Sequence, residues 1–138
     1  MPDEDCIFCK IAAGDLPAEI VQEDEHTVAF MDINPWTRGH ALVIPRNHSR
    51  NVYDAPDEDL EHATTAAKRL ALRMRESLGC DGINLLNSAE PAAWQTVFHL
   101  HLHVIPRYDD DPLRLPGQPR QPEEGELAQV AAELRGTS

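Results

Sequence analysis

The sequence predicts one domain in which a long helix covers a β-sheet. A chain of 138 residues can bury one hydrophobic core but is short for two domains. Polar and apolar residues alternate strictly over 98–104, which is the period of a β-strand. Between residues 57 and 78, apolar side chains recur every three or four positions, which is the period of a helix that packs on one face.

The N-terminal half is predicted to form a short helix and three strands. Residues 6–14 have helical or turn-like apolar spacing, which ends at the Gly14–Pro17 segment. Strands over 19–22 and 26–31 are joined by a short acidic connection, as in a hairpin. A turn-rich segment over 34–39 leads into a buried strand over 40–44, which Pro45 ends.

The long helix is predicted to begin after Pro56 and to end at Gly79. Acidic residues fill its first turn, where the helix dipole favours negative charge, and glycine suits the left-handed cap. Its apolar stripe consists of Leu60, Ala63, Ala67, Leu70, Met74 and Leu78. Two more strands are predicted over 82–87 and 96–107. We therefore expect a core domain over residues 1–107 and a proline-rich C-terminal extension over 108–138, with a short helix near its end over 126–135.

Composition excludes several classes of partner. The formal net charge is -12 and the chain has no basic run, so a nucleic-acid partner is not expected. No segment has the length and apolarity of a membrane span, and the acidic N-terminus does not resemble a secretion signal. We expect a cytoplasmic protein, in which three cysteines, an odd number, do not form structural disulfides.

Three histidines dominate the alternating segment. On one continuous strand, His99, His101 and His103 would share a face, while Phe98, Leu100, Leu102 and Val104 would point to the other. Imidazoles can donate or accept hydrogen bonds, ligate a metal or attack phosphorus near neutral pH. Two alternatives are an ordinary solvated strand face and a catalytic zinc bound by the histidines themselves.

Cys6 and Cys9 form a CxxC pair that we interpret as half of a zinc site. A redox pair would be expected after a strand, and the few residues before Cys6 leave no room for one. Two thiolates need two further ligands in a closed tetrahedral site. Spacing alone does not choose among His26, His40, His48, His62 and the three alternating histidines. Two small buried thiols without a metal are the simpler alternative.

The alternating segment, His99-Leu100-His101-Leu102-His103-Val104-Ile105, resembles the signature of the histidine triad (HIT) family. Further blocks resemble that family in the same order: residues 6–11, 30–35, 39–45 and 95–98. The resemblance covers roughly residues 5–107 and implies an α+β fold. It implies a five-stranded antiparallel sheet, one long helix, a short N-terminal helix, and a homodimer across which the sheet continues.

The resemblance also implies a reaction and its residues. His101 would attack the α-phosphate of a purine nucleotide and form a nucleotidyl-histidine intermediate, which water then hydrolyses. His103 and His40 would flank the phosphate, and Gln95 and Thr96 would contact it. Asp32 would bind the ribose hydroxyls. The remaining nucleotide-binding residues would be Asn87, near the sugar or phosphate, and the apolar Ile7, Phe8, Ile11, Phe30 and Ile33, around the base.

In the cysteine-bearing branch of the family, the resemblance assigns a structural zinc ion to Cys6, Cys9, His48 and His99. Activity on a nucleoside phosphoramidate or a related 5'-phosphoryl adduct is expected. The alternatives are hydrolysis of dinucleoside polyphosphates and a regulatory nucleotide-binding module with negligible turnover. Trp94 stands where many members have glycine, and the loop before Gln95 is one residue longer than the common form. Both departures are expected to affect which leaving groups the site accepts.

Overall fold

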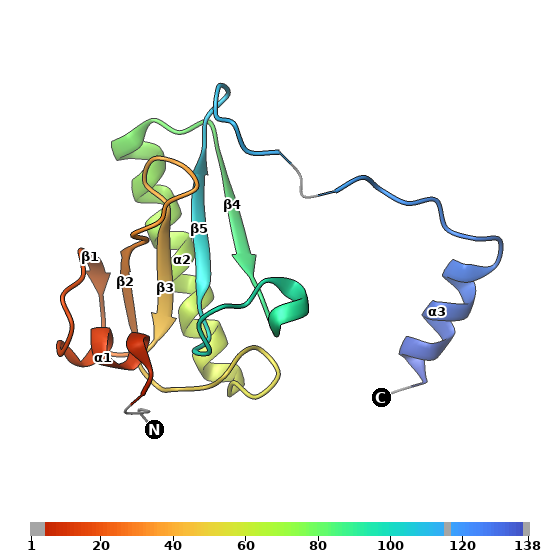
Figure 1. Ribbon diagram of the computed structural model, residues 1–138, viewed down its shortest axis with the longest axis horizontal. Coiled ribbons are helices and arrows are strands. Elements are labelled where there is room, and N and C mark those ends of the chain that lie inside the picture. Colours follow the sequence, from red (N-terminus) through yellow and green to blue (C-terminus); the bar gives the residue numbers. More distant parts are fainter. Residues whose placement is uncertain (1–4, 115–116, 137–138) are drawn as a thin grey trace.

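The computed structural model describes residues 5–114 and 117–136 and contains the predicted five-stranded antiparallel sheet. Its strands are β1 (Ile20–Glu23), β2 (Thr27–Met31), β3 (Ala41–Pro45), β4 (Gly82–Asn87) and β5 (Leu102–Arg107). They lie in the order β1-β2-β3-β5-β4, so that β5 is inserted between β3 and β4 (Figure 1). The sequence therefore predicts the number of strands and their approximate positions correctly.

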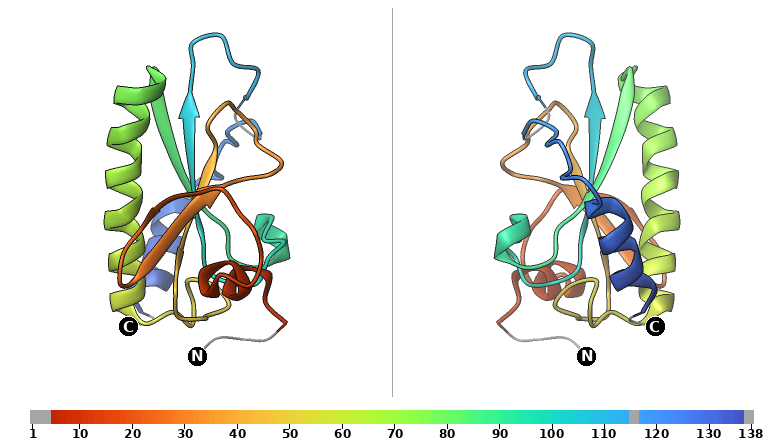
Figure 2. Two further views of the ribbon diagram at one scale, coloured as in Figure 1. Left: turned by 90° about the vertical axis from the view of Figure 1, so that its left-hand side faces the viewer. Right: turned by 90° about the vertical axis from the view of Figure 1, so that its right-hand side faces the viewer.

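Helices lie on both sides of the sheet. The long α2 (Asp57–Leu78) runs along one face, and the short α1 (Ile7–Ala13) lies against the other (Figure 2). A short 3-10 helix, η1 (Pro91–Ala93), follows β4. The last helix, α3 (Glu126–Arg135), stands apart from the sheet at the end of an irregular segment (Figure 1). None of the helices in the described ranges has the length and apolarity needed to cross a membrane.

Each face of the sheet has its own hydrophobic core. Under α2, a cluster joins the apolar stripe of the helix to alternate residues of the strands, including Ala41, Val43, Leu102 and Val104. The second cluster lies under α1 and consists of Phe8, Ile11, Val28, Phe30, Leu42 and Ile44. Because alternate side chains point to opposite faces, Leu42 and its register partner His103 lie on the α1 side. The side of β5 that carries His103 is therefore the α1 side of the sheet, where His103 is partly buried.

The final strand is shorter than predicted. A strand over 96–107 was expected, but β5 begins only at Leu102, and His99 and His101 precede it. Strand β4 accounts for the difference on one side, because its last residue, Asn87, pairs with Leu102 and β4 offers no partner to the residues before it. The backbone N–H of Leu100 instead donates to the carbonyl of Ser49 at 2.9 Å. The preceding segment is thus held by a loop instead of a sheet ladder.

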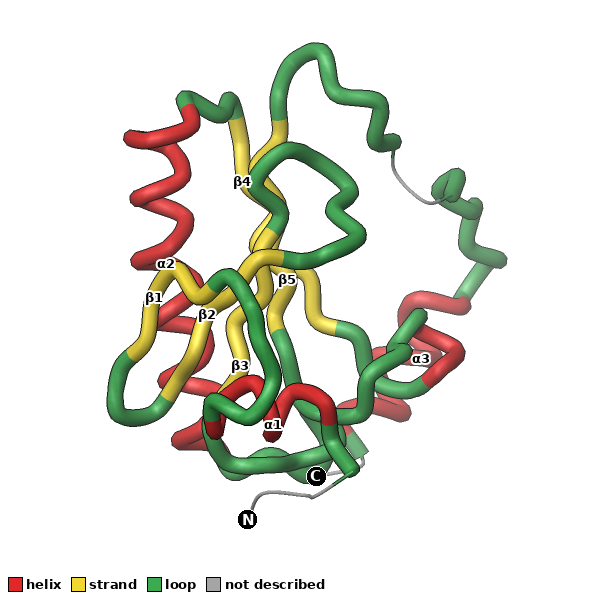
Figure 3. The backbone as a smooth tube through the Cα atoms, turned by 60° about the vertical axis from the view of Figure 1, so that its left-hand side comes forward, coloured by secondary structure: helices red, strands yellow, loops and turns green. Residues whose placement is uncertain are grey.

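The prediction that the apolar residues of this segment share one buried face is also wrong at its start. Leu100, Leu102 and Val104 are buried, but Phe98 is 36% exposed. Its ring packs under the guanidinium of Arg50, with 4.2 Å between the guanidinium carbon and the ring centroid. Figure 3 shows the loop character of the chain leading into β5.

Candidate functional site

A cavity of about 490 Å³ lies between α1, the end of β2 and the start of β5. Most of the residues predicted to bind a nucleotide line it. The apolar ones are Ile7, Phe8, Ile11, Phe30 and Ile33, and the polar ones are Asp32, Thr96, His101 and His103. Seven further residues line the cavity without having been predicted as site residues: Leu16, Pro17, Ala18, Met31, Asn34, Leu42 and Val97. The last four lie in the family-like blocks, but their side chains have no chemistry that marks them as ligand contacts.

His101 is held in one defined tautomer. Its Nδ1 lies 2.7 Å from the carbonyl oxygen of His99, so Nδ1 carries the proton and donates it. The lone pair of the neutral ring is therefore on Nε2. Burial lowers the pKa of His101, which is 5% exposed, and keeps the ring neutral at pH 7. Phe8 meets the ring edge-on at a centroid distance of 5.1 Å and restrains its orientation.

His40 and His103 form a hydrogen-bonded pair with a defined polarity. The backbone N–H of Trp36 donates to His40 Nδ1 at 3.0 Å, so the proton of neutral His40 resides on Nε2. His40 Nε2 then donates to His103 Nδ1 at 2.9 Å, which leaves His103 Nε2 as an N–H donor. Burial lowers the pKa of His103 to about 4, and the nearby rings of His101 and His40 contribute in the same direction. Burial likewise lowers the pKa of the fully buried His40.

Asp32, His40 and His103 lie close enough together to suggest a second metal site, but the hydrogen bonds argue against one. Their ligand atoms lie within 4.8 Å of one another. However, both ring nitrogens of His40 are already used, one as acceptor and one as donor. Asp32 Oδ2 lies 3.6 Å from His40 Nε2, and its charge favours the proton there. The arrangement suits handling of protons rather than binding of a cation.

Gly39 determines where His40 enters β3. Its φ of +95° is in the region that favours glycine, and a Cβ atom there would lie 2.5 Å from Cδ1 of Leu78. The turn therefore packs directly on the end of α2 while it presents His40 to the opposite side of the sheet.

Asn87 and Gln95 do not line the cavity but position the segment that does. Asn87 Nδ2 donates to the carbonyl of His101 at 2.9 Å. The buried amide of Gln95 makes four hydrogen bonds: Nε2 donates to the carbonyls of Arg50 and Val97, and Oε1 accepts from Asn51 and the backbone of Glu90.

Trp94 points away from the nucleotide cavity. It is 59% exposed, has a φ of 76°, and is absent from the residues that line the cavity. Glu90, which also has a φ of 76°, is held by the guanidinium of Arg50 at 2.7 Å and by Asn51 at 2.7 Å. The longer loop before Gln95 is therefore a tightly bonded structure with an outward indole.

The second predicted constellation also assembles. Sγ of Cys6 lies 3.3 Å from Nδ1 of His99, and Sγ of Cys9 lies 3.4 Å from Nδ1 of both His99 and His48. A tetrahedral zinc ion with ordinary bond lengths would separate sulfur and nitrogen ligands by about 3.5 Å. The four ligand atoms lie within 4.8 Å of one another. The spacing and the donor types therefore both fit zinc.

The buried His99 is oriented for metal binding. Its Nε2 donates to the carbonyl of Pro45 at 2.8 Å, which turns the unprotonated Nδ1 toward the two sulfurs. Burial raises the pKa of the Cys6 thiol, so a cation would be needed to favour the thiolate. His26 and His62 were also candidate zinc ligands from the sequence. Their rings instead stack on each other with a centroid distance of 3.8 Å.

Comparison with known proteins identifies the family. The protein-family model described as "HIT domain" matches residues 13–110 of this chain. "Protein hit" of Bacillus subtilis is 49% identical over 105 residues, which cover 76% of this chain and 72% of that protein.

Solved structures agree in fold. The SMU.412c protein of Streptococcus mutans superposes with a TM-score of 0.92 at 36% identity, over 97% of this chain and 85% of that one. A Zn-bound histidine triad family protein of Mycobacterium smegmatis superposes with a TM-score of 0.77 at 40% identity, over 97% and 98% of the two chains. The chain belongs to the HIT, or histidine triad, family.

Proposed function

We propose that this protein is a nucleotide hydrolase that attacks the α-phosphate of a purine nucleoside 5'-phosphoryl adduct through His101. The observation that carries the proposal is the fixed tautomer of His101, a neutral buried ring with its lone pair on Nε2, in the wall of a cavity of about 490 Å³. Neutral imidazole is a competent nucleophile, and a covalent intermediate divides one difficult displacement into two easier ones.

The cavity supplies both parts of a nucleoside site. Apolar side chains from α1 and β2 would enclose the flat base, and the half-buried carboxylate of Asp32 would accept hydrogen bonds from the ribose hydroxyls. With these two contacts, the 5'-phosphoryl group would lie toward the histidines, since His101 and His103 line the same cavity.

In the first step, the lone pair of His101 Nε2 forms a bond to phosphorus. The bond from phosphorus to the leaving group breaks, and its electron pair goes to the departing atom. Positive charge then develops on the His101 ring, where the Nδ1–H bond to the carbonyl of His99 stabilises it. His103 Nε2–H would give its proton to the departing atom, and the hydrogen bond from His40 Nε2 to His103 Nδ1 would stabilise the ring that remains.

In the second step, water attacks the same phosphorus and displaces His101. His103 Nε2, having given up its proton in the first step, would accept the proton that the water loses, so that the His40–His103 pair returns to its starting state. The products are a nucleoside monophosphate and the regenerated neutral imidazole. Thr96 adds a further polar side chain to the same cavity.

Zinc in this proposal is structural. Cys6, Cys9, His48 and His99 would hold the ion, which would tie α1 to the segment that carries His101. His99 then has two roles, since its side chain binds the metal and its carbonyl orients the nucleophile. The Zn-bound relative of M. smegmatis supports this assignment.

The relatives support the class of reaction. One superposed structure is named as a HIT family hydrolase of Clostridium thermocellum, and another as a hypothetical histidine triad nucleotide-binding protein of Sulfolobus tokodaii. The adduct closest to the proposal is a phosphoramidate, in which nitrogen is the departing atom. The protein is further proposed to act as a homodimer whose sheet continues across the two copies.

A turnover assay tests the proposal. The purified protein should release AMP from adenosine 5'-phosphoramidate, and His101→Ala should lose at least about a thousandfold in kcat, since it removes the attacking atom. His62→Ala changes a histidine on the far side of the sheet and is the matched control. Nucleotide binding without any turnover by the wild-type protein would favour a regulatory binding module instead.

A further inference from the structure

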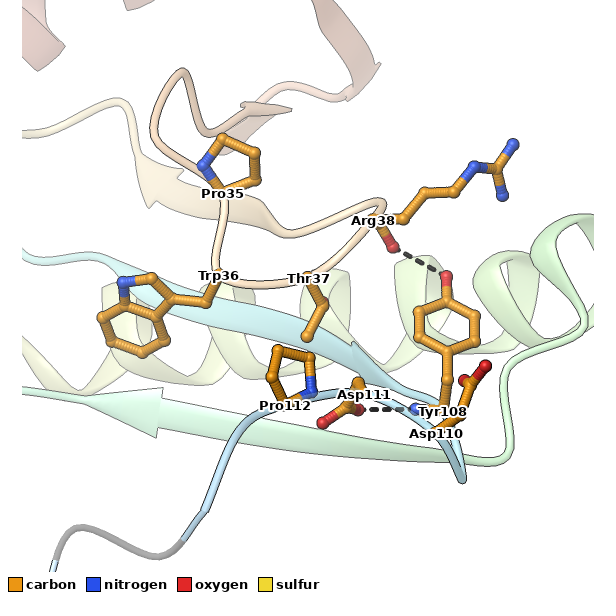
Figure 4. Close-up of a pocket in the computed structure, with 8 residues that line it drawn as sticks. All are labelled: Pro35, Trp36, Thr37, Arg38, Tyr108, Asp110, Asp111 and Pro112. Atoms are coloured by element: carbon orange, nitrogen blue, oxygen red, sulfur yellow. Dashed lines mark hydrogen bonds between the residues drawn. The ribbon is translucent and has the colours of Figure 1, made fainter.

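We propose that the cavity between residues 35–38 and 108–112 is a subsite for a leaving group that carries an aromatic ring. This inference rests on the proposed function and names what that reaction would release. The cavity measures about 570 Å³, and Figure 4 shows the residues that line it. One of them, Trp36, packs on the catalytic His103. It is separate from the nucleoside cavity, since the two share no lining residue.

Trp36 lines the second cavity and packs on His103, which lines the nucleoside cavity. Its indole stacks on the ring of His103 with a centroid distance of 5.2 Å and an interplanar angle of 10°. His103 in turn contacts His101 at a centroid distance of 5.1 Å, so the rings run in sequence from nucleophile to indole. The indole is 45% exposed and lines the second cavity. A group that leaves phosphorus past His103 therefore meets an available aromatic surface.

Thr37 provides an independent sign that a ligand belongs here. It also lines the cavity and is only 7% exposed, yet its hydroxyl has no hydrogen-bond partner within the described part of the chain. A buried hydroxyl without a partner costs free energy, and most buried polar atoms in proteins are satisfied. A polar atom on a bound leaving group would complete it.

The opposite wall is rigid and nearly neutral. Tyr108 donates its hydroxyl to the carbonyl of Arg38 at 2.7 Å, which joins the two loops (Figure 4). Asp111 is neutralised by two hydrogen bonds of 2.9 Å from Arg107. The remaining charges of the lining, Arg38 and Asp110, have opposite signs. Recognition of the leaving group would thus depend on the indole of Trp36 and the hydroxyl of Thr37 rather than on the net charge of the cavity.

The chemistry of the step is unchanged. His101 Nε2 bonds to phosphorus, the P–N bond of a phosphoramidate breaks, and the amine nitrogen keeps the electron pair and takes the proton of His103 Nε2. The aromatic part of the amine stacks on Trp36 throughout. An aromatic contact of this kind is worth about 0.5–1.5 kcal/mol, or about 2- to 13-fold in kcat/KM.

Matched substrates test the subsite. The wild-type protein should hydrolyse the N-(2-phenylethyl) phosphoramidate of AMP about fivefold faster, in kcat/KM, than the N-ethyl phosphoramidate, whose amine has no ring. Trp36→Ala should abolish that preference, and Trp36→Phe should keep part of it. Since Trp36 also packs on His103, the ratio for the two substrates is the measurement, not either rate alone.

Trp94→Ala is the matched control, because it removes an exposed indole that lies outside the cavity. It should leave the preference intact. A preference that survives Trp36→Ala, or one that Trp94→Ala removes, would overturn the subsite. If the wild-type protein hydrolysed neither substrate, that result would instead contradict the proposed function.

The hydroxyl of Thr37 is tested with a tyramine adduct, which adds a phenol to the same amine. Thr37→Val should lower kcat/KM for the tyramine adduct more than for the phenylethyl adduct, while thermal stability stays equal or rises because an unpartnered polar atom is removed. An equal effect on both adducts would contradict the hydrogen bond to this hydroxyl.

Discussion

At the scale of single residues, backbone groups define the state of each histidine. The carbonyl of His99 fixes the tautomer of His101, and the backbone N–H of Trp36 fixes that of His40. The sequence predicts which histidines gather, because the motif is distinctive. It does not predict the Trp36 contact, since any residue other than proline could supply that N–H at this position.

The lowered pKa of His103 predicts a pH-dependent stability. Because its folded-state pKa is about 4, against 6.5 for the free ring, the unfolded chain binds this proton more readily. The contribution of neutral His103 to the free energy of unfolding is therefore complete above pH 6.5 and is lost as the pH falls toward 4. Between pH 7 and pH 5, His103→Gln should lose about 1 kcal/mol less stability than the wild-type protein, measured by urea unfolding of zinc-loaded samples. A variant that loses as much stability as wild type would contradict the shift.

Asn87 is expected to act by positioning. Asn87→Ala removes the hydrogen bond to the carbonyl of His101, so the nucleophile is less well aligned. We expect kcat to fall by about tenfold with little change in KM, because the amide does not line the nucleotide cavity. Asn87→Asp cannot donate and should not restore activity. A change confined to KM would indicate direct contact with the substrate instead.

At the scale of elements, the site depends on how three segments meet at the start of β5: α1, the loop that follows β3, and residues 96–101. Alternation predicts a long strand, but pairing stops where β4 ends, and residues 96–101 are held by the loop that follows β3. A single sequence shows periodicity, whereas strand ends depend on where a neighbour stops. The zinc site is likewise only partly evident from the sequence. Cys6 and Cys9 stand out as a pair, but the histidines that meet them lie far away along the chain.

Removal of the metal is predicted to loosen α1. Cys9→Ser should reduce zinc content from one ion per chain to well below one and lower the Tm by roughly 5–10 °C, since a structural site contributes directly to folding. Cys80→Ala changes the third cysteine, which lies in the α2 core, and should keep full zinc content. Wild-type protein without zinc in a metal analysis would contradict the assignment.

At the scale of the whole molecule, the sequence predicts the fold well because each segment has a clear period and clear boundaries. A solvated histidine face was one alternative from the sequence, whereas α1 packs on that side of the sheet in the structure. The assembly stays a prediction. Strand β4 is an edge of the sheet, and its Leu85 is 48% exposed.

A homodimer formed along β4 should have about twice the 15.4 kDa mass of the chain in light scattering. Leu85→Lys should shift the protein toward monomer, because a charge on an edge strand opposes pairing with another edge. Ile20→Lys places the same charge on the opposite edge and should remain dimeric. A wild-type protein that is monomeric at high concentration would contradict the dimer.

The covalent intermediate tests the central claim most directly. Protein mixed with a nucleoside phosphoramidate should carry one nucleoside monophosphate group on His101. The mixture is quenched within milliseconds in an alkaline denaturant, because the P–N bond to histidine is labile in acid, and is analysed by intact mass and peptide mapping at alkaline pH. Active protein with no adduct, or with an adduct on His103 or on another residue, would contradict the account.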